Sequence, residues 1–178
     1  MNRKCQLFFI LSLLTATWQM AKGNQRIEIY TDGAARGNPG PGGYGIVMKY
    51  GSYRKEISQG YRLTTNNRME LLAVIVALEQ LRYKNSDVVV YSDSKYVCEA
   101  VNKGWIFDWE RKGFKKKKNP DLWKKFLKVY RDHRIELVWI KGHSNHIEND
   151  QCDRLAVAAS QKDNLPDDEG YVEDSKLF

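Results

Sequence analysis

The sequence predicts an α/β domain in which helices cover both faces of a mixed five-stranded sheet. Three observations predict this fold. Three β-rich runs follow one another, a long helical pattern comes next, and a short, continuously apolar strand stands between helical segments. The chain has 178 residues, which leaves room for one such domain and for no second large one.

The first three strands are predicted as a meander. Residues 27–31, 43–50 and 53–61 are β-rich, with Gly and Pro between the first two runs and Gly51-Ser52 between the last two. The Gly-rich run 37–43 lacks the Gly-Lys-Ser/Thr of a phosphate-binding loop and leads into a strand. It is therefore interpreted as a turn.

The rest of the chain predicts helices separated by two more strands. Thr64-Thr65-Asn66 offers caps for a helix to about Gln80 that is apolar on most sides and should be central and buried. The elements expected after it are a parallel strand at 88–91, a helix from Ser94, a helix from the cap Asn119-Pro120 to about Tyr130, a strand at 135–140 and a helix at 148–160.

The two ends are assigned outside the domain, which is placed at residues 26–162. Residues 1–25 contain a charged start and the apolar stretch Cys5 to Trp18, as in a secretory signal, but no good cleavage site follows. A true start at Met20 and a cytoplasmic protein are preferred; an exported or membrane-anchored binding protein stays the alternative. Scattered cysteines indicate a reducing compartment. Residues 163–178 carry six acids against Lys176 and are predicted to be a flexible tail.

Positive charge is concentrated in residues 102–134. This segment has twelve Lys and Arg against four acids, 12 − 4 = +8, compared with +7 for the whole chain. It also carries the aromatic residues Trp105, Phe107, Trp109, Phe114 and Trp123. Cations interleaved with rings suit a nucleic acid, whose backbone is anionic and whose bases are flat. The alternative is a solvated helix face with its tryptophans turned to the core.

Four acids stand at positions where a sheet of this kind places its site. Asp32 and Asp93 follow the first and fourth strands, Glu70 lies one turn into the long helix, and Asp153 lies early in the last helix. Four converging carboxylates repel unless cations neutralise them, and magnesium needs only one or two carboxylates per ion plus substrate phosphate oxygens. Two such ions are the arrangement used in phosphodiester hydrolysis. Taken singly, each acid has an ordinary alternative role, and Asp93 could be a helix cap.

His143 lies in the loop between the last strand and the last helix. A histidine there can titrate near neutrality and move a proton to or from an attacking or leaving group.

Four motifs then occur in a fixed order: Thr31-Asp32-Gly33 through Gly45, Thr65-Asn66-Asn67-Arg68-Met69-Glu70-Leu71, Ser92-Asp93-Ser94, and Lys141-Gly142-His143 through Cys152-Asp153. In order and spacing they resemble the bacterial type 1 ribonuclease H family over about residues 26–160. The resemblance implies a ribonuclease H-like fold and an endonuclease that cuts the RNA strand of RNA–DNA hybrids, leaving 5′-phosphate and 3′-hydroxyl ends. It implies that Asp32, Glu70, Asp93 and Asp153 bind two Mg²⁺ ions, which Mn²⁺ can replace, and that His143 assists proton transfer or product release.

The resemblance also implies the substrate contacts. Asn38, Asn66 and Asn67 match positions that meet the minor groove and the RNA 2′-hydroxyls, and the Gly-rich turn should let the duplex backbone come close. Thr65 and Asn119 match a pocket for a DNA phosphate. The remaining expected contacts are in the basic protrusion that grips the DNA strand: Trp105, Trp109, Lys112 and Lys115.

One departure from the family concerns the phosphate pocket. The arginine usual two residues before Thr65 is Leu63 here, with Arg62 beside it. A weakened or rebuilt pocket is therefore expected.

The RNA–DNA hybrid is the expected partner, and a monomer with no obligate protein partner is predicted. The other function considered is a nucleic-acid binding module that kept the basic segment and lost chemistry. The presence of all four acids argues against it.

Overall fold

The structure is a computed structural model that describes residues 26–142 and 146–171. One sheet of five strands runs through it in the order β3-β2-β1-β4-β5. The strands are β1 (Ile27–Ala35), β2 (Gly40–Tyr50), β3 (Tyr53–Thr64), β4 (Asp87–Ser92) and β5 (Arg134–Trp139). The first three pair antiparallel as a meander, while β4 pairs parallel with β1 and β5 parallel with β4. The predicted mixed five-stranded α/β fold is confirmed.

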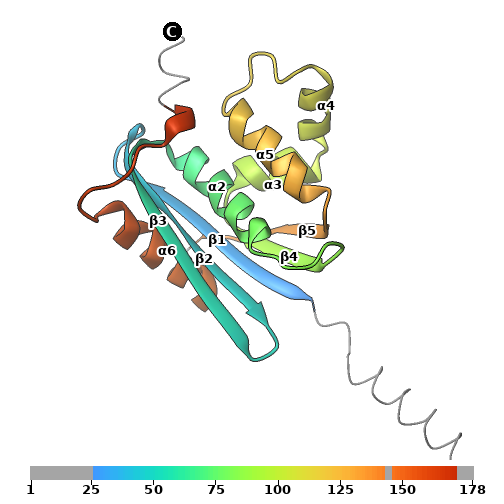
Figure 1. Cartoon of the computed structure of the whole chain (residues 1–178), viewed down its shortest axis with the longest axis horizontal. Helices are drawn as coiled ribbons and strands as arrows, with labels where there is room; N and C mark the ends of the chain where they lie inside the picture. Colours follow the sequence, from blue (N-terminus) through green and yellow to red (C-terminus); the bar gives the residue numbers. More distant parts are fainter. Residues whose placement is uncertain (1–25, 143–145, 172–178) are drawn as a thin grey trace, which may run out of the picture.

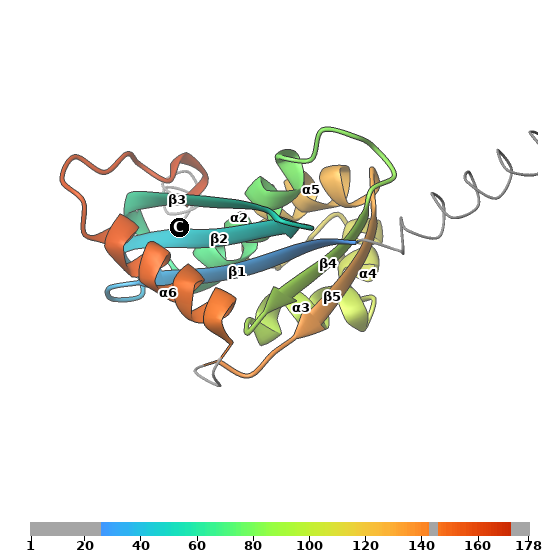
Figure 2. The same ribbon diagram turned by 90° about the horizontal axis from the view of Figure 1, so that it is seen from below.

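Helices lie on both faces of this sheet. The helices are α2 (Asn66–Glu79), α3 (Lys95–Asn102), α4 (Trp105–Arg111), α5 (Pro120–Tyr130) and α6 (Ile147–Ser160). Helix α6 runs across β1, β2 and β3 on one face, and α2 packs against β1 and β2 on the other, with α5 behind α2 (Figures 1 and 2). Strands β1 and β2 are therefore covered by helices on both faces.

The core forms between α2 and the sheet because α2 is apolar on nearly every side. Its side chains from Met69 to Leu78 are almost all buried, and Ile29, Val90 and Trp123 pack into the same cluster. Burial on this scale is the main favourable term in folding. The prediction of a central, buried helix is confirmed.

Local signals place most helix starts. Thr65 caps α2 by accepting a hydrogen bond from the backbone N–H of Arg68, and Ser94 caps α3 by accepting one from Val97. Pro120 stands in the first turn of α5, as predicted. Sequence analysis gave no residue range for α4.

The Gly-rich run is only partly a turn. Residues 37–39 connect β1 to β2, but 40–43 already belong to β2. A Cβ placed on Gly43 would lie 2.7 Å from the carbonyl oxygen of Ala156 in α6. The interpretation of the whole run as a turn is therefore wrong, since its last glycines let a helix lie close to the sheet.

The expectation of a flexible acidic tail from residue 163 is wrong as far as residue 171. The backbone N–H of Arg62 donates to the carbonyl of Pro166, and Asp168 is only 6% exposed because it pairs with Arg68. Residues 172–178 lie outside the described part of the chain, as do residues 1–25. In residues 26–142 and 146–171, no helix has the length and apolar character needed to cross a membrane.

Gly45→Ala should destabilise the fold and displace α6. A Cβ at Gly45 would lie 2.0 Å from the carbonyl oxygen of Cys152, which is too close for any real contact. We expect a loss of about 1 to 3 kcal/mol in the free energy of unfolding, measured by urea denaturation. Ala158→Val, on the exposed side of α6, is the control and should cost less than about 1 kcal/mol. Equal losses for the two variants would contradict the close approach.

Candidate active site

The parallel pairing of β1 with β4 brings two of the predicted acids together. Thr31 is opposite Ser92 in this pairing, so Asp32 and Asp93 are the next residues on neighbouring strands. Asp93 follows the end of β4, but Asp32 lies within β1, which continues to Ala35 in its pairing with β2. The prediction that the first strand ends before Asp32 is therefore wrong. Both side chains are partly buried. This edge is where open α/β sheets place their functional groups.

Glu70 reaches the same edge because Gly33 lets α2 approach β1. A Cβ at Gly33 would lie 2.3 Å from the backbone nitrogen of Glu70, so only glycine allows this packing. The Glu70 carboxylate accepts hydrogen bonds from Asn66 Nδ2 at 2.8 Å and from Ser94 Oγ at 2.5 Å. These bonds tie the start of α2 to the start of α3 and orient Glu70.

Asp153 comes from the opposite face of the sheet, on α6. The preceding residue, Cys152, is fully buried, and its thiol donates to the carbonyl of Tyr30 at 3.2 Å. The close contact of Cys152 with Gly45, which pairs with Asp32 in the sheet, sets this part of α6 against the end of β1. Asp153 is thereby close enough to act on Asp32 electrostatically.

Asp32 is influenced by burial and by the other three acids. Burial raises the pKa of Asp32 to about 8; the Asp93 carboxylate adds to this, the Gly33 N–H opposes it, and Asp153 and Glu70 raise it further. Burial likewise raises the pKa of Glu70 to about 7, against the hydrogen bond from Ser94 and with a further contribution from Asp93. Without cations, this edge of the sheet therefore holds carboxylates that resist ionisation.

The donor set fits hard divalent cations. All four groups offer carboxylate oxygens, and positive charge would relieve the repulsion that raises the pKa values of Asp32 and Glu70. In the described residues, no three His, Cys, Asp or Glu side chains are placed to hold one ion together. Hard divalent cations can bind through one or two carboxylates each and complete their shell with water and substrate phosphate oxygens.

The backbone around Asp93 is held by β5 and the loop after it. Trp139 Nε1 donates to the carbonyl of Asp93 at 2.9 Å, and a Cβ at Gly142 would lie 2.6 Å from Asp93 Oδ2. The alternative that Asp93 caps α3 is wrong, because Ser94 is the cap. The loop toward His143 therefore passes Asp93, but His143 itself lies outside the described residues.

Two of the three asparagines predicted to meet the minor groove share a hydrogen bond at the start of α2. The side-chain oxygen of Asn38 accepts from the backbone N–H of Asn66 at 3.2 Å, and Asn67 follows with an exposed side chain. Because Asn66 also binds Glu70, this group is continuous with the acidic edge.

The aromatic residues of the basic segment divide between surface and core. Trp105 is 41% exposed, and the Lys103 ammonium lies over its ring. Trp109 is half-buried, and the Lys117 ammonium lies over its ring. Trp123 is fully buried. Lys112 and Lys115 are exposed. Both interpretations of this segment are thus partly right: α5 packs on the core, and α4 with the following loop presents cations and rings.

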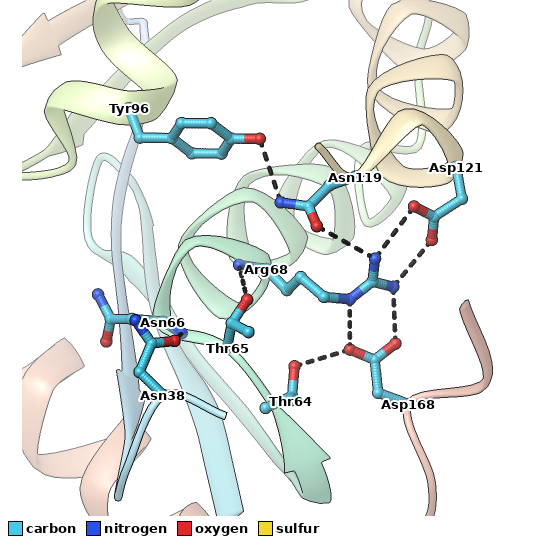
Figure 3. Close-up of polar contacts among 9 residues, drawn as sticks. All are labelled: Asn38, Thr64, Thr65, Asn66, Arg68, Tyr96, Asn119, Asp121 and Asp168. Atoms are coloured by element: carbon cyan, nitrogen blue, oxygen red, sulfur yellow. Dashed lines mark hydrogen bonds and ion pairs between the residues drawn. The ribbon is translucent and has the colours of Figure 1, made fainter. Parts of the chain in front are cut away.

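The predicted phosphate pocket is built around Arg68 (Figure 3). The hydroxyl of Thr65 accepts from the Arg68 N–H, and the amide oxygen of Asn119 accepts from the guanidinium at 3.5 Å. Asn119 stands at the predicted N-cap position of α5, where its carbonyl accepts from the backbone N–H of Trp123. Its backbone is left-handed, its side chain makes no capping bond, and its amide nitrogen donates to Tyr96 instead.

Arg62 does not replace the missing arginine at Leu63. Its guanidinium pairs with Asp167 at 2.5 Å, on the side of β3 where Thr64 binds Asp168. Leu63 alternates to the other side of the strand and is 39% exposed.

Sequence analysis missed Arg68, Asp168 and Trp139. A signal existed for Arg68, because a charged residue in a helix apolar on most sides must find buried partners. The sequence offered no equivalent signal for Asp168 or Trp139.

The chain is similar to known ribonuclease H proteins in sequence and in structure. The family described as RNase H matches residues 24–161. A ribonuclease H of Rippkaea orientalis is 53% identical over 83% of this chain and 93% of its own, and one of Trichodesmium erythraeum is 54% identical over 85% and 99%. The crystal structure of LC9-RNase H1, a type 1 RNase H with the type 2 active-site motif, is 29% identical with a TM-score of 0.69 and covers 76% of this chain and 72% of its own. LC11-RNase H1 in complex with RNA/DNA hybrid is 32% identical with a TM-score of 0.58 and covers 75% and 96%.

The chain therefore belongs to the RNase H family. Within that family it is of the bacterial type 1 form, and the enzyme is a ribonuclease H endonuclease.

The raised pKa of Asp32 predicts how stability depends on pH in the absence of divalent ions. A group whose pKa is higher in the folded state contributes stability below its unfolded pKa, about 4, and loses it as the pH rises through about 8. Asp32→Asn should therefore have the higher thermal midpoint at pH 8 in EDTA, by about 2 to 4 °C per kcal/mol recovered, and should lose that advantage near pH 4.

Calorimetry from pH 4 to 9 measures this difference, with Asp163→Asn, an exposed acid outside the site, as the control. Magnesium at pH 8 should raise the midpoint of the native chain more than that of Asp32→Asn. Parallel pH profiles for the native chain and Asp32→Asn would contradict the electrostatic argument.

Proposed function

We propose that the enzyme hydrolyses the RNA strand of RNA–DNA hybrids endonucleolytically, using two divalent cations and leaving 5′-phosphate and 3′-hydroxyl ends. The observation that carries this proposal is the electrostatic coupling of Asp32 to Asp93, Asp153 and Glu70 at one edge of the sheet, in a chain of the RNase H family. The hybrid complex of LC11-RNase H1 supports the substrate assignment.

Asp32, Glu70, Asp93 and Asp153 would hold the cations, with Mg²⁺ as the expected ion and Mn²⁺ as a substitute. When bound, these ions would prepare a water as nucleophile and stabilise the departing oxygen. The protein's own contribution is orientation: Asn66 and Ser94 fix Glu70, and Trp139 fixes the backbone at Asp93. Hydrolysis joins a water oxygen to phosphorus and breaks the bond to the 3′ oxygen, which takes up a proton.

His143 is proposed to handle that proton or to assist product release. Gly142, its neighbour, lies against the Asp93 carboxylate, so the loop that carries His143 reaches the acidic edge. An imidazole titrates near neutrality and can both accept and donate a proton there.

Recognition of RNA is assigned to two asparagines at the start of α2 and to Asn38, which contacts Asn66 from the connection between β1 and β2. Asn38, Asn66 and Asn67 carry amide donors and acceptors next to Glu70, where a ribose 2′-hydroxyl of the cleaved strand would lie. This position next to the acids couples recognition of the sugar to cleavage of the adjoining phosphate.

The binding affinity of the enzyme for the hybrid is assigned to contacts with the DNA strand, and these contacts do not depend on the nucleotide sequence. Rings and cations on α4 and the loop after it are offered by Trp105, Trp109, Lys112 and Lys115. Hydrogen-bond donors are offered by Thr65 at the start of α2 and Asn119 at the start of α5. Phosphate contacts of this kind release counterions, so binding should weaken steeply with salt. We further propose that the catalytic domain begins at residue 26 and includes the packed segment up to residue 171, beyond the expected end at residue 162, and that the protein is monomeric and cytoplasmic.

Asp32→Asn should abolish magnesium-dependent cleavage, with a loss on the order of a thousandfold or more, because removing a ligand from a two-ion site removes its chemistry. Hybrid binding should persist, since the contacts to the DNA strand are elsewhere. A gel assay on labelled hybrid, beside double-stranded RNA and DNA and with or without EDTA, measures cleavage, and mass spectrometry identifies the product ends. Native rates in this variant would refute the metal assignment.

His143→Ala should slow turnover by about ten- to a thousandfold without abolishing it, because general acid–base assistance is one contribution among several. His146→Ala, in the same loop and exposed, is the matched control and should retain most of the activity. Single-turnover and steady-state rates separate proton transfer from product release. An unaffected rate in both regimes would show that another group handles the proton.

A further inference from the structure

The C-terminal segment 166–171 reaches the predicted phosphate pocket through one buried ion pair. Asp168 is 6% exposed and Arg68 is 1% exposed, and two parallel bonds at 2.7 and 2.8 Å join the carboxylate to the guanidinium (Figure 3). Thr64 donates a further bond to Asp168 at 2.7 Å. Asp121 of α5 binds the other side of the same guanidinium at 2.8 and 3.0 Å.

Arg68 in turn fixes the two side chains that the pocket offers. Its backbone N–H donates a hydrogen bond to the Thr65 hydroxyl oxygen, and its guanidinium donates one to the amide oxygen of Asn119. A hydroxyl that accepts in this way can still donate its hydrogen. The Asn119 amide nitrogen carries two N–H groups, of which one bond to Tyr96 uses only one. Both side chains are thereby set as donors, which is what an anion needs.

We propose that Asp168, acting through the Arg68 guanidinium, is a positioning residue of the substrate site, and that the C-terminal segment orients Asn119, beside Thr65, as a donor toward a phosphate of the DNA strand. This inference rests on the proposed function. It assigns part of the substrate site to a segment about 100 residues away from the pocket in sequence.

The role of this segment is orientation and not attraction. Arg68 with Asp121 and Asp168 carries a net charge of −1, from one cation and two carboxylates. That charge repels a phosphate. If the segment acted only through its charge, removal of the Asp168 carboxylate would strengthen phosphate binding. If it orients the donors, the same change weakens binding, because a guanidinium held on one side alone does not keep the Asn119 amide in place.

The experiment uses hybrids in which single DNA-strand phosphates are replaced, one at a time, by uncharged methylphosphonates. In the native enzyme, the replacement that falls on the pocket should lower kcat/KM on the order of tenfold, as expected for hydrogen bonds to a charged group. In Asp168→Asn this penalty should shrink to about threefold or less, with KM for the unmodified hybrid raised about fivefold. Asp168→Glu should recover part of the penalty.

Asp167→Asn is the matched control. It removes a neighbouring carboxylate of the same segment, whose partner Arg62 is exposed and has no bond to the pocket. Its methylphosphonate profile should equal that of the native chain. Asp121→Asn, whose carboxylate is 36% exposed and therefore less costly to the fold, provides a second route to the same loss should Asp168→Asn fail to fold.

The outcomes are distinguishable. An unchanged penalty in both Asp168→Asn and Asp121→Asn, or a lower KM in them, would overturn the positioning role. Absence of a penalty at every DNA-strand position in the native enzyme would also overturn it, while leaving hybrid cleavage intact. Failure of the native enzyme to cleave any hybrid would instead refute the proposed function itself.

Discussion

The parallel pairing of β1 with β4 is the constraint on which the site depends. Because Thr31 stands opposite Ser92, Asp32 and Asp93 emerge side by side. Slippage by one residue would turn one of the two to the other face of the sheet. The other acids are brought to this pair from opposite faces, at points where Gly33 and Gly45 leave no room for a side chain.

Gathering carboxylates at one edge of the sheet lowers the stability of the folded state, and the packing of the rest of the fold offsets this loss. Burial and mutual repulsion raise the pKa values of Asp32 and Glu70, so the site opposes its own ionisation until cations are present. The apolar helix α2 and the closely packed α6 supply the rigidity that holds the acids there. Shifted pKa values of this kind are common at functional sites, where burial and like charges are brought together.

A second buried charge system lies two residues before Glu70 on the same helix. Arg68 satisfies its hydrogen-bonding capacity with Asp121, Asp168 and Asn119, so its burial is fully compensated. The same helix thus presents an acid to one site and organises hydrogen-bond donors beside another. The distance between cleavage chemistry and the proposed grip on the DNA strand is therefore set within one rigid element.

The sequence by itself determined the order of the elements, because periodicity, caps such as Thr65 and Ser94, and the proline at 120 act over a few residues. It also singled out the four acids, although Asp32 lies inside β1 and not after it. Only the tertiary structure decided that Asn119 turns away from its helix and that Asp168 is buried. Those side chains are positioned by bonds to Arg68, which is 51 and 100 residues away, and no local pattern encodes a contact that exists only after the chain has packed.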